Sequence, residues 1–378
     1  MTKTKEFSLE DQIKRIALEE GATLVGICSA DSIKNKKFSD PNYLLPGAQS
    51  VISIAIKFDD EKVRKFISKE DRMPLSIEEG EVTKSLKRVG EKIKIFLEGK
   101  GFKAYNCDVN FNYRFTRRTG VNPQTVVSTL RILIDLINKE KDQNIELTKR
   151  EKKTLERLKN LMLPGFRKTP MNLVPNFSHR CAAVASGLGR VGFSGNVITE
   201  RFGARILLNS IITDAKLNVD NPLENHPCTN CKICEKSCQG GLFSKDGTQK
   251  IKIAGIEETI AKRNSYAYCI AVCSGMVGQN KFKEWSIWSP FRFDDIEKLP
   301  LDDSVNDYVQ NMFAKAVEKG GKEAENVLRL VENSFLGRNN KPAEEFRPSC
   351  GFCQLVCGPT MKDKKESYNS IINSGCVN

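Results

Sequence analysis

The order of apolar and polar positions predicts alternating helices and strands in the N-terminal part of the chain. Ser8 and Asp11 form an S-x-x-D cap ahead of apolar residues at helical spacing, which predicts where the first helix begins. Short, uninterrupted apolar runs are typical of buried strands. The predicted elements, in chain order, are a helix from residue 9, strands at 21–30 and 51–58, a helix at 85–101 and a strand at 102–109. This order predicts an α/β layer built around one sheet.

From about residue 124 to 163 the pattern becomes helical and highly charged. Leu155, Leu158 and Leu161 share one face, and lysines and arginines occupy the other. Such a pattern is typical of a solvated surface helix, although RNA could also contact its basic face. Residues 174–214 then mix a helix, a glycine-rich loop and a strand.

Length and composition fit a globular protein of two domains. The chain has 378 residues, of which 39% are hydrophobic and 28% are charged. No apolar run is long enough to span a membrane, and the N-terminus lacks the pattern of a signal peptide, so a cytoplasmic location is expected. The expected domains are 1–220, with a charged helical insert at about 124–163, and 221–378, with an insert at about 276–345.

The charge balance favours anionic partners. The formal net charge is +13, which suits phosphates, nucleotides, RNA or an acidic redox protein. A solvated basic surface without any such partner explains the same charge, so the two interpretations stand side by side.

Thirteen cysteines are the strongest chemical signal in the chain. A cytosolic protein keeps its thiols reduced, so clustered cysteines favour metal binding over disulfides. The run C-x2-C-x2-C-x3-C at 228–238 and the run C-x2-C-x3-C at 350–357 are typical of [4Fe–4S] ligation. Zinc is the rival metal, but it usually takes paired C-x2-C loops. Four other cysteines stand in strand- or helix-like contexts and are expected to be buried apolar residues: Cys28, Cys107, Cys181 and Cys376.

The spacing predicts how the ligands are shared between two [4Fe–4S] clusters. Three cysteines of one tight loop occupy three corners of a cube, and the last cysteine of each run ligates the other cluster. The second cluster lacks one ligand, for which Cys269 is preferred and Cys273 is the alternative at helical spacing. The predicted sets are Cys228, Cys231, Cys234 and Cys357 for cluster 1, and Cys238, Cys269, Cys350 and Cys353 for cluster 2.

The segment GLGRVG at 187–192 fits the dinucleotide pattern G-x-G-x-x-G letter for letter. A dinucleotide fingerprint follows a strand and opens a helix, whereas this segment follows the helical pattern HRCAAVAS. Binding of NAD or FAD at this loop is therefore not expected.

Four segments in this order resemble epoxyqueuosine reductases and reductive dehalogenases, which are cobalamin-dependent enzymes. The segments are GATLVGICSAD, AVASGLGRVGFSGN, FGARILLNSIITDAKL and the cysteine set ending in CGFCQLVCG. The resemblance implies a nitroreductase-like α/β (α+β) corrinoid-binding domain, followed by a ferredoxin-like double [4Fe–4S] domain. It also implies cobalamin contacts at Gly187, Gly189, Gly192, Gly195, Asn196, Ile212 and Thr213.

The cobalamin implied by the resemblance is expected to be base-off. The chain has two histidines, and neither lies in a D-x-H-x-x-G arrangement that would supply a lower cobalt ligand. Cobalt without an axial donor is easier to reduce to Co(I), and a low-potential cluster can reach that state. A ferredoxin or flavodoxin would supply the electrons, and the chemistry would be anaerobic.

The chain departs from epoxyqueuosine reductases where their aspartate proton donor stands. The matching position falls near Leu173, and the Glu-Arg pair that follows becomes His179-Arg180. His179 could donate a proton near neutral pH or only bridge the loop, Arg180 could hold an anion, and Tyr113 is another possible acid.

The expected function is that of a cobalamin- and iron–sulfur-dependent reductase. Co(I) would drive reductive cleavage of a carbon–heteroatom bond in a small organic substrate. Reduction of epoxyqueuosine in tRNA is the first alternative, which the missing aspartate disfavours and the positive charge favours. An iron–sulfur electron-transfer protein without a corrinoid is the second alternative.

Overall fold

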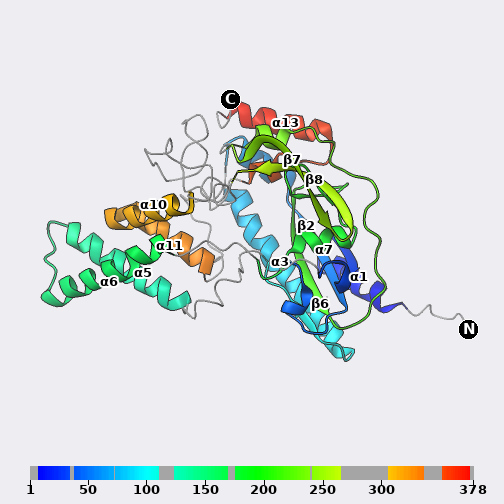
Figure 1. The fold of residues 1–378 in the computed structure, drawn as a ribbon, viewed down its shortest axis with the longest axis horizontal. Coiled ribbons are helices and arrows are strands. Elements are labelled where there is room, and N and C mark those ends of the chain that lie inside the picture. The colour runs from blue at the N-terminus through cyan, green and yellow to red at the C-terminus, as the bar shows by residue number, and fades with distance from the viewer. Residues whose placement is uncertain are drawn as a thin grey trace, which may run out of the picture.

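An antiparallel sheet of four strands forms the centre of the N-terminal half (Figure 1). The strands, in sheet order, are β1 (Leu24–Ser29), β2 (Ser50–Lys57), β6 (Ile206–Thr213) and β3 (Ala104–Asn106). Each pair of neighbours is antiparallel, with Ile27 opposite Ile52 and Ile52 opposite Ile211. The computed structural model describes residues 7–34, 38–71, 73–109, 123–168, 175–238, 241–264, 305–335 and 351–374.

Helices cover both faces of this sheet, which explains the uninterrupted apolar runs of its strands. On one face, Ile52 and Ile54 pack against helices α1 (Leu9–Glu19) and α3 (Met73–Gly99). On the other face, Val51 packs near helix α7 (His179–Ala185). Successive side chains of a strand point to opposite faces, so both sets of positions must be apolar.

The predicted mixed α/β character is confirmed, and the first helix and the strands overlap their predicted ranges, although the strand expected at 102–109 is shortened to Ala104–Asn106. The helix expected at 85–101 begins earlier, at Met73, because Leu75 and Val82 continue its buried face through a charged stretch. Three of the cysteines expected to be buried apolar residues share one core: Cys28, Cys107 and Cys181.

The two stretches expected as separate inserts pack together into one helical unit. Figure 1 shows its four helices side by side, apart from the central sheet. They share a core whose innermost side chains include Leu130, Leu133 and Val327, all 0% exposed. The helices are α5 (Pro123–Lys141), α6 (Lys149–Lys168), α10 (Val305–Lys319) and α11 (Gly321–Phe335).

A separate apolar core surrounds the cysteine segments. Helix α2 (Asp60–Ile67) joins it from the N-terminal half, with Phe66 edge-on to Phe352 at 6.1 Å between ring centroids. The other elements of this region are the short pair β4 (Arg190–Val191) and β5 (Val197–Ile198), helix α8 (Ile233–Lys236), the hairpin of β7 (Phe243–Ile253) and β8 (Ile256–Arg263), and helices α12 (Phe352–Leu355) and α13 (Met361–Asn373).

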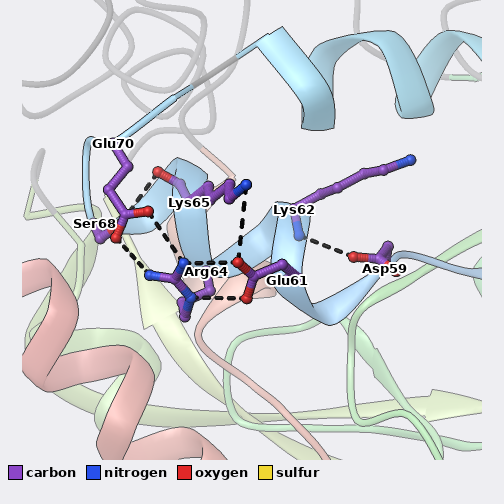
Figure 2. A network of polar contacts seen from close by, with 7 residues as sticks. All are labelled: Asp59, Glu61, Lys62, Arg64, Lys65, Ser68 and Glu70. Carbon is purple, nitrogen blue, oxygen red and sulfur yellow. Dashed lines mark hydrogen bonds and ion pairs between the residues drawn. The ribbon is translucent and has the colours of Figure 1, made fainter.

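The opposite face of α2 is charged and points away from this core (Figure 2). Asp59 caps the helix by accepting the backbone N–H of Lys62. Arg64 pairs with Glu61 within the helix and with Glu70 beyond it, which ties the following turn to the helix. The helix is thus amphipathic, and its apolar face is free to cover the cysteine region.

No helix in the described ranges is long and apolar enough to cross a membrane.

Candidate metal centre

Four cysteines from two distant segments line one pocket. These are Cys228, Cys231, Cys234 and Cys357, and Phe193 lines the same pocket. Within the described part of the chain, no three His, Cys, Asp or Glu side chains stand close enough to hold a single metal ion. The four residues instead line one shared space, and a cluster with one thiolate at each corner needs its ligands around such a space.

Left-handed backbone shapes the two cysteine loops alike. Asn230 and Lys232 have φ angles of 53° and 58°, and Lys232 directly precedes α8. Gly351 has a φ angle of 61° and directly precedes α12. Such backbone costs a non-glycine residue about 1–2 kcal/mol, so it is retained where the surrounding structure requires it. In both loops, the left-handed residues lie between successive cysteines and turn the chain sharply there.

The glycine-rich loop supplies hydrogen bonds to the cysteines. The backbone N–H of Phe193 donates to Cys228 Sγ at 3.5 Å, and Asn196 Nδ2 donates to Cys353 Sγ at 3.7 Å. Hydrogen bonds to the sulfurs are among the factors that set the potential of an iron–sulfur cluster. The loop therefore touches one cysteine of each predicted cluster set.

Packing within the protein accounts for the glycines of this loop. A Cβ atom at Gly187 would stand 2.4 Å from the carbonyl oxygen of Asn221, and one at Gly189 would stand 2.4 Å from that of Ile198. A Cβ atom at Gly192 would come within 3.2 Å of Cys228 Sγ. These positions need glycine because other backbone and the cysteine loop approach so closely.

The remaining cobalamin-contact candidates are also in contact with protein atoms. Arg263 fills the side-chain space at Gly195. Ile212 is fully buried in the sheet, and Thr213 donates its hydroxyl to the carbonyl of Lys103. A contact of these seven residues with a corrinoid stays a prediction.

Burial is the main cause of the raised pKa of two of these cysteine thiols, Cys234 and Cys357. It raises the pKa of the Cys357 thiol to about 11, and the nearby Lys364 ammonium opposes this rise. Burial also raises the pKa of Cys234, and the neighbouring cysteines raise it further because adjacent thiolates repel. Metal ions require thiolates as ligands, so binding here would release protons.

The second predicted set is described only in part. The backbone N–H of Leu242 donates to Cys238 Sγ at 3.2 Å, and Cys353 packs against the same apolar core. The other candidate ligands and the candidate acid lie outside the described residues: Cys269, Cys273, Cys350 and Tyr113.

His179 bridges two backbone segments. Its Nε2 lies 3.1 Å from the carbonyl oxygen of Asp108, which can only accept, so Nε2 carries the hydrogen. Its Nδ1 then accepts from the hydroxyl of Ser210 at 3.0 Å. Arg180 donates to the carbonyl of Gly195 at 3.2 Å. The contacts of His179 agree with the alternative in which this residue only bridges the loop. A role of His179 or Arg180 in catalysis stays a prediction.

We expect His179 to make stability depend on pH. Burial lowers the pKa of its imidazole from the ordinary value of 6.5, so the folded state holds the neutral ring. Its contribution is fully present above pH 6.5 and is lost as pH falls through the lower, folded-state pKa. Thermal midpoints measured at pH 8 and at pH 5 should differ less for His179→Gln than for the parent protein. Equal differences would contradict this role.

An ion-pair network that no sequence motif indicated holds the start of the cysteine loop. Glu258, 1% exposed, pairs with Arg190 Nε at 2.7 Å, and its Oε2 lies 3.2 Å from His226 Nε2. His226 Nδ1 in turn accepts the backbone N–H of Cys228 at 3.0 Å. Glu258 lies among other charged residues of β8, so its burial was not apparent from the pattern.

Two groups of curated proteins are similar to this chain. An epoxyqueuosine reductase of Cellulophaga algicola is 25% identical over 157 residues, which cover 38% of this chain and 51% of that protein. A tetrachloroethene reductive dehalogenase of Desulfitobacterium hafniense is 30% identical over 129 residues, which cover 28% of this chain and 22% of that protein. The matches thus span about half and about a fifth of these relatives. No protein-family model matches the chain.

Among solved structures, that of a B12-dependent reductive dehalogenase matches with a TM-score of 0.42 and 14% identity, covering 87% of this chain and 37% of that one. Both groups of curated relatives are reductases, and hence oxidoreductases. The resemblance inferred from the sequence motifs is confirmed: the chain is a divergent homologue of the epoxyqueuosine reductases and the reductive dehalogenases.

Proposed function

We propose that this protein is a cobalamin- and iron–sulfur-dependent reductase that holds two [4Fe–4S] clusters and cleaves a carbon–heteroatom bond in a small organic substrate. The observation that carries the proposal is the convergence of Cys228, Cys231, Cys234 and Cys357 on one pocket. Two segments far apart in the sequence supply these thiols, as the ligand exchange between two clusters requires.

Electrons would enter at the more exposed cluster and pass to the one nearer the corrinoid. The described ligands of both clusters are half-buried, except Cys234 of cluster 1, which is buried. The glycine-rich loop of the N-terminal half contacts one cysteine of each set, Cys228 and Cys353. A ferredoxin or flavodoxin would reduce the clusters, which would pass electrons toward that half.

Cobalamin is the acceptor that the resemblance implies. The positions first considered for it, such as Gly187 and Ile212, have protein atoms on their side-chain side. Their contact with a corrinoid stays a prediction, which the cobalt content after reconstitution tests.

Epoxyqueuosine in tRNA is the second candidate substrate. The similarity to an epoxyqueuosine reductase and the net charge of +13 favour it, because a basic protein attracts the phosphate backbone. Epoxyqueuosine reductases have an aspartate proton donor at a position that falls near Leu173 in this chain. The aspartate is missing here, which favours the small organic substrate.

Anaerobic reconstitution with iron, sulfide and cobalamin, followed by metal counts per chain, tests the proposal. We expect about eight iron atoms, the content of two [4Fe–4S] clusters, and one equivalent of cobalt. The variant Cys234→Ala should lose cluster 1, whereas Cys181→Ala, which removes a buried cysteine of the sheet core, should keep both clusters.

The outcomes separate the alternatives. Iron without cobalt would assign the protein to electron transfer without a corrinoid. Zinc in place of iron would contradict the proposal. If cobalt binds, a salt-dependent affinity for tRNA would favour the epoxyqueuosine substrate, since phosphate contacts weaken as salt rises.

A further inference from the structure

A buried lysine stands beside the four cysteines of the pocket. Lys364 lies in helix α13, is 3% exposed and lines the same space as Cys228 and Cys357. Lysines are almost never buried to this extent without a partner. Among the described residues, its ammonium makes no hydrogen bond or ion pair.

The acids and cations around Lys364 have other roles. Asp363, its neighbour in the chain, caps α13 through a reciprocal bond with Thr360. Arg205 bonds to Asp60 and to Ser367. Neither Asp363 nor Arg205 is thus left to interact with Lys364, and a buried ammonium without a balancing charge is costly. A negatively charged group in the pocket would remove that cost.

A [4Fe–4S] cluster is such a group. With four thiolates it carries a net negative charge, which increases by one electron on reduction. A fixed cation nearby stabilises the more negative, reduced state more than the oxidised state, and burial strengthens the interaction because the surrounding dielectric is low. The cation therefore makes the cluster easier to reduce.

We propose that Lys364 is a positioning residue that sets the potential of cluster 1, because its buried ammonium faces the cysteines of that cluster. The inference rests on the proposed function, since it requires a cluster in this pocket. It raises the potential of cluster 1 relative to a site without the cation, which makes this cluster easier to reduce.

Redox titration of the reconstituted protein, followed by electron paramagnetic resonance, tests this role. Lys364→Met should lower the reduced-to-oxidised ratio of one cluster about tenfold at a fixed potential, which corresponds to a shift of about 59 mV for a one-electron couple. The other cluster should keep its potential. Lys364→Arg should keep both potentials, and so should Lys365→Met, which removes an exposed lysine at the next position of α13.

Each outcome decides one claim. If the parent protein assembles no iron–sulfur cluster, the proposed function itself fails. If clusters assemble and Lys364→Met leaves both potentials unchanged, only the role of Lys364 is overturned. If Lys364→Met loses iron while Lys364→Arg retains it at the parent potential, the need for a buried cation is supported. Loss of iron in both variants would assign Lys364 to packing and overturn the proposal.

Discussion

Gly203→Ala should lower the iron content from about eight to about four atoms per chain, because it removes cluster 1. Gly203 has a φ angle of +57°, and a Cβ atom there would stand 2.2 Å from the carbonyl oxygen of Cys357. The backbone N–H of Ala204 donates to that same oxygen at 2.8 Å. An added methyl group must therefore displace the peptide that carries a predicted ligand of cluster 1. Iron analysis and the visible absorption of the reconstituted protein measure the loss.

The matched control is Gly255→Ala in the turn between β7 and β8. Gly255 also has a positive φ angle, +80°, but its Cβ position has no neighbour within 4 Å. Both substitutions carry the strain of left-handed backbone, about 1–2 kcal/mol, and only one meets Cys357. Full iron content in Gly203→Ala would show that the contact with Cys357 does not hold the cluster.

Arg205→Met should reduce the free energy of unfolding by about 2–4 kcal/mol and speed the release of iron. Arg205 is 6% exposed and donates to the carbonyl of Leu355, to Asp60 and to the hydroxyl of Ser367. It thereby ties the start of β6 to α2, α12 and α13. Methionine fills a similar volume but leaves the buried oxygens of Leu355 and Ser367 without a donor, and this desolvation cost produces the loss.

Arg201→Met serves as the control for this substitution. Arg201 is exposed, and its guanidinium lies 5.1 Å from the centre of the Phe202 ring. An exposed contact of this kind contributes about 0.5–1 kcal/mol, so the effect should stay below that of Arg205→Met. Urea midpoints and the rate of iron release to a chelator compare the two variants. Similar values for both variants would mean that Arg205 does not hold the N-terminal half to the cysteine region.

The sequence by itself determined the elements and the chemistry that depend on neighbouring residues. Helical and strand periodicities repeat within a few residues, so α1, β1, β2 and β6 could be predicted from the apolar pattern. The spacing of cysteines within each loop restricts which sulfurs can reach one cube, so the ligand sets could be proposed before the fold was known. The helical context of GLGRVG likewise argued against a dinucleotide site.

Only the tertiary structure decided the relations between residues far apart in the chain. Two inserts became one helical unit because neither α5–α6 nor α10–α11 buries its apolar face alone. The glycine-rich loop proved to pack on the cysteines, and Lys364 and Glu258 proved to be buried beside them. Local patterns do not report such contacts, because burial of a lysine or glutamate depends on which distant segments cover it. The same residues in a solvated helix or strand would have an identical sequence pattern.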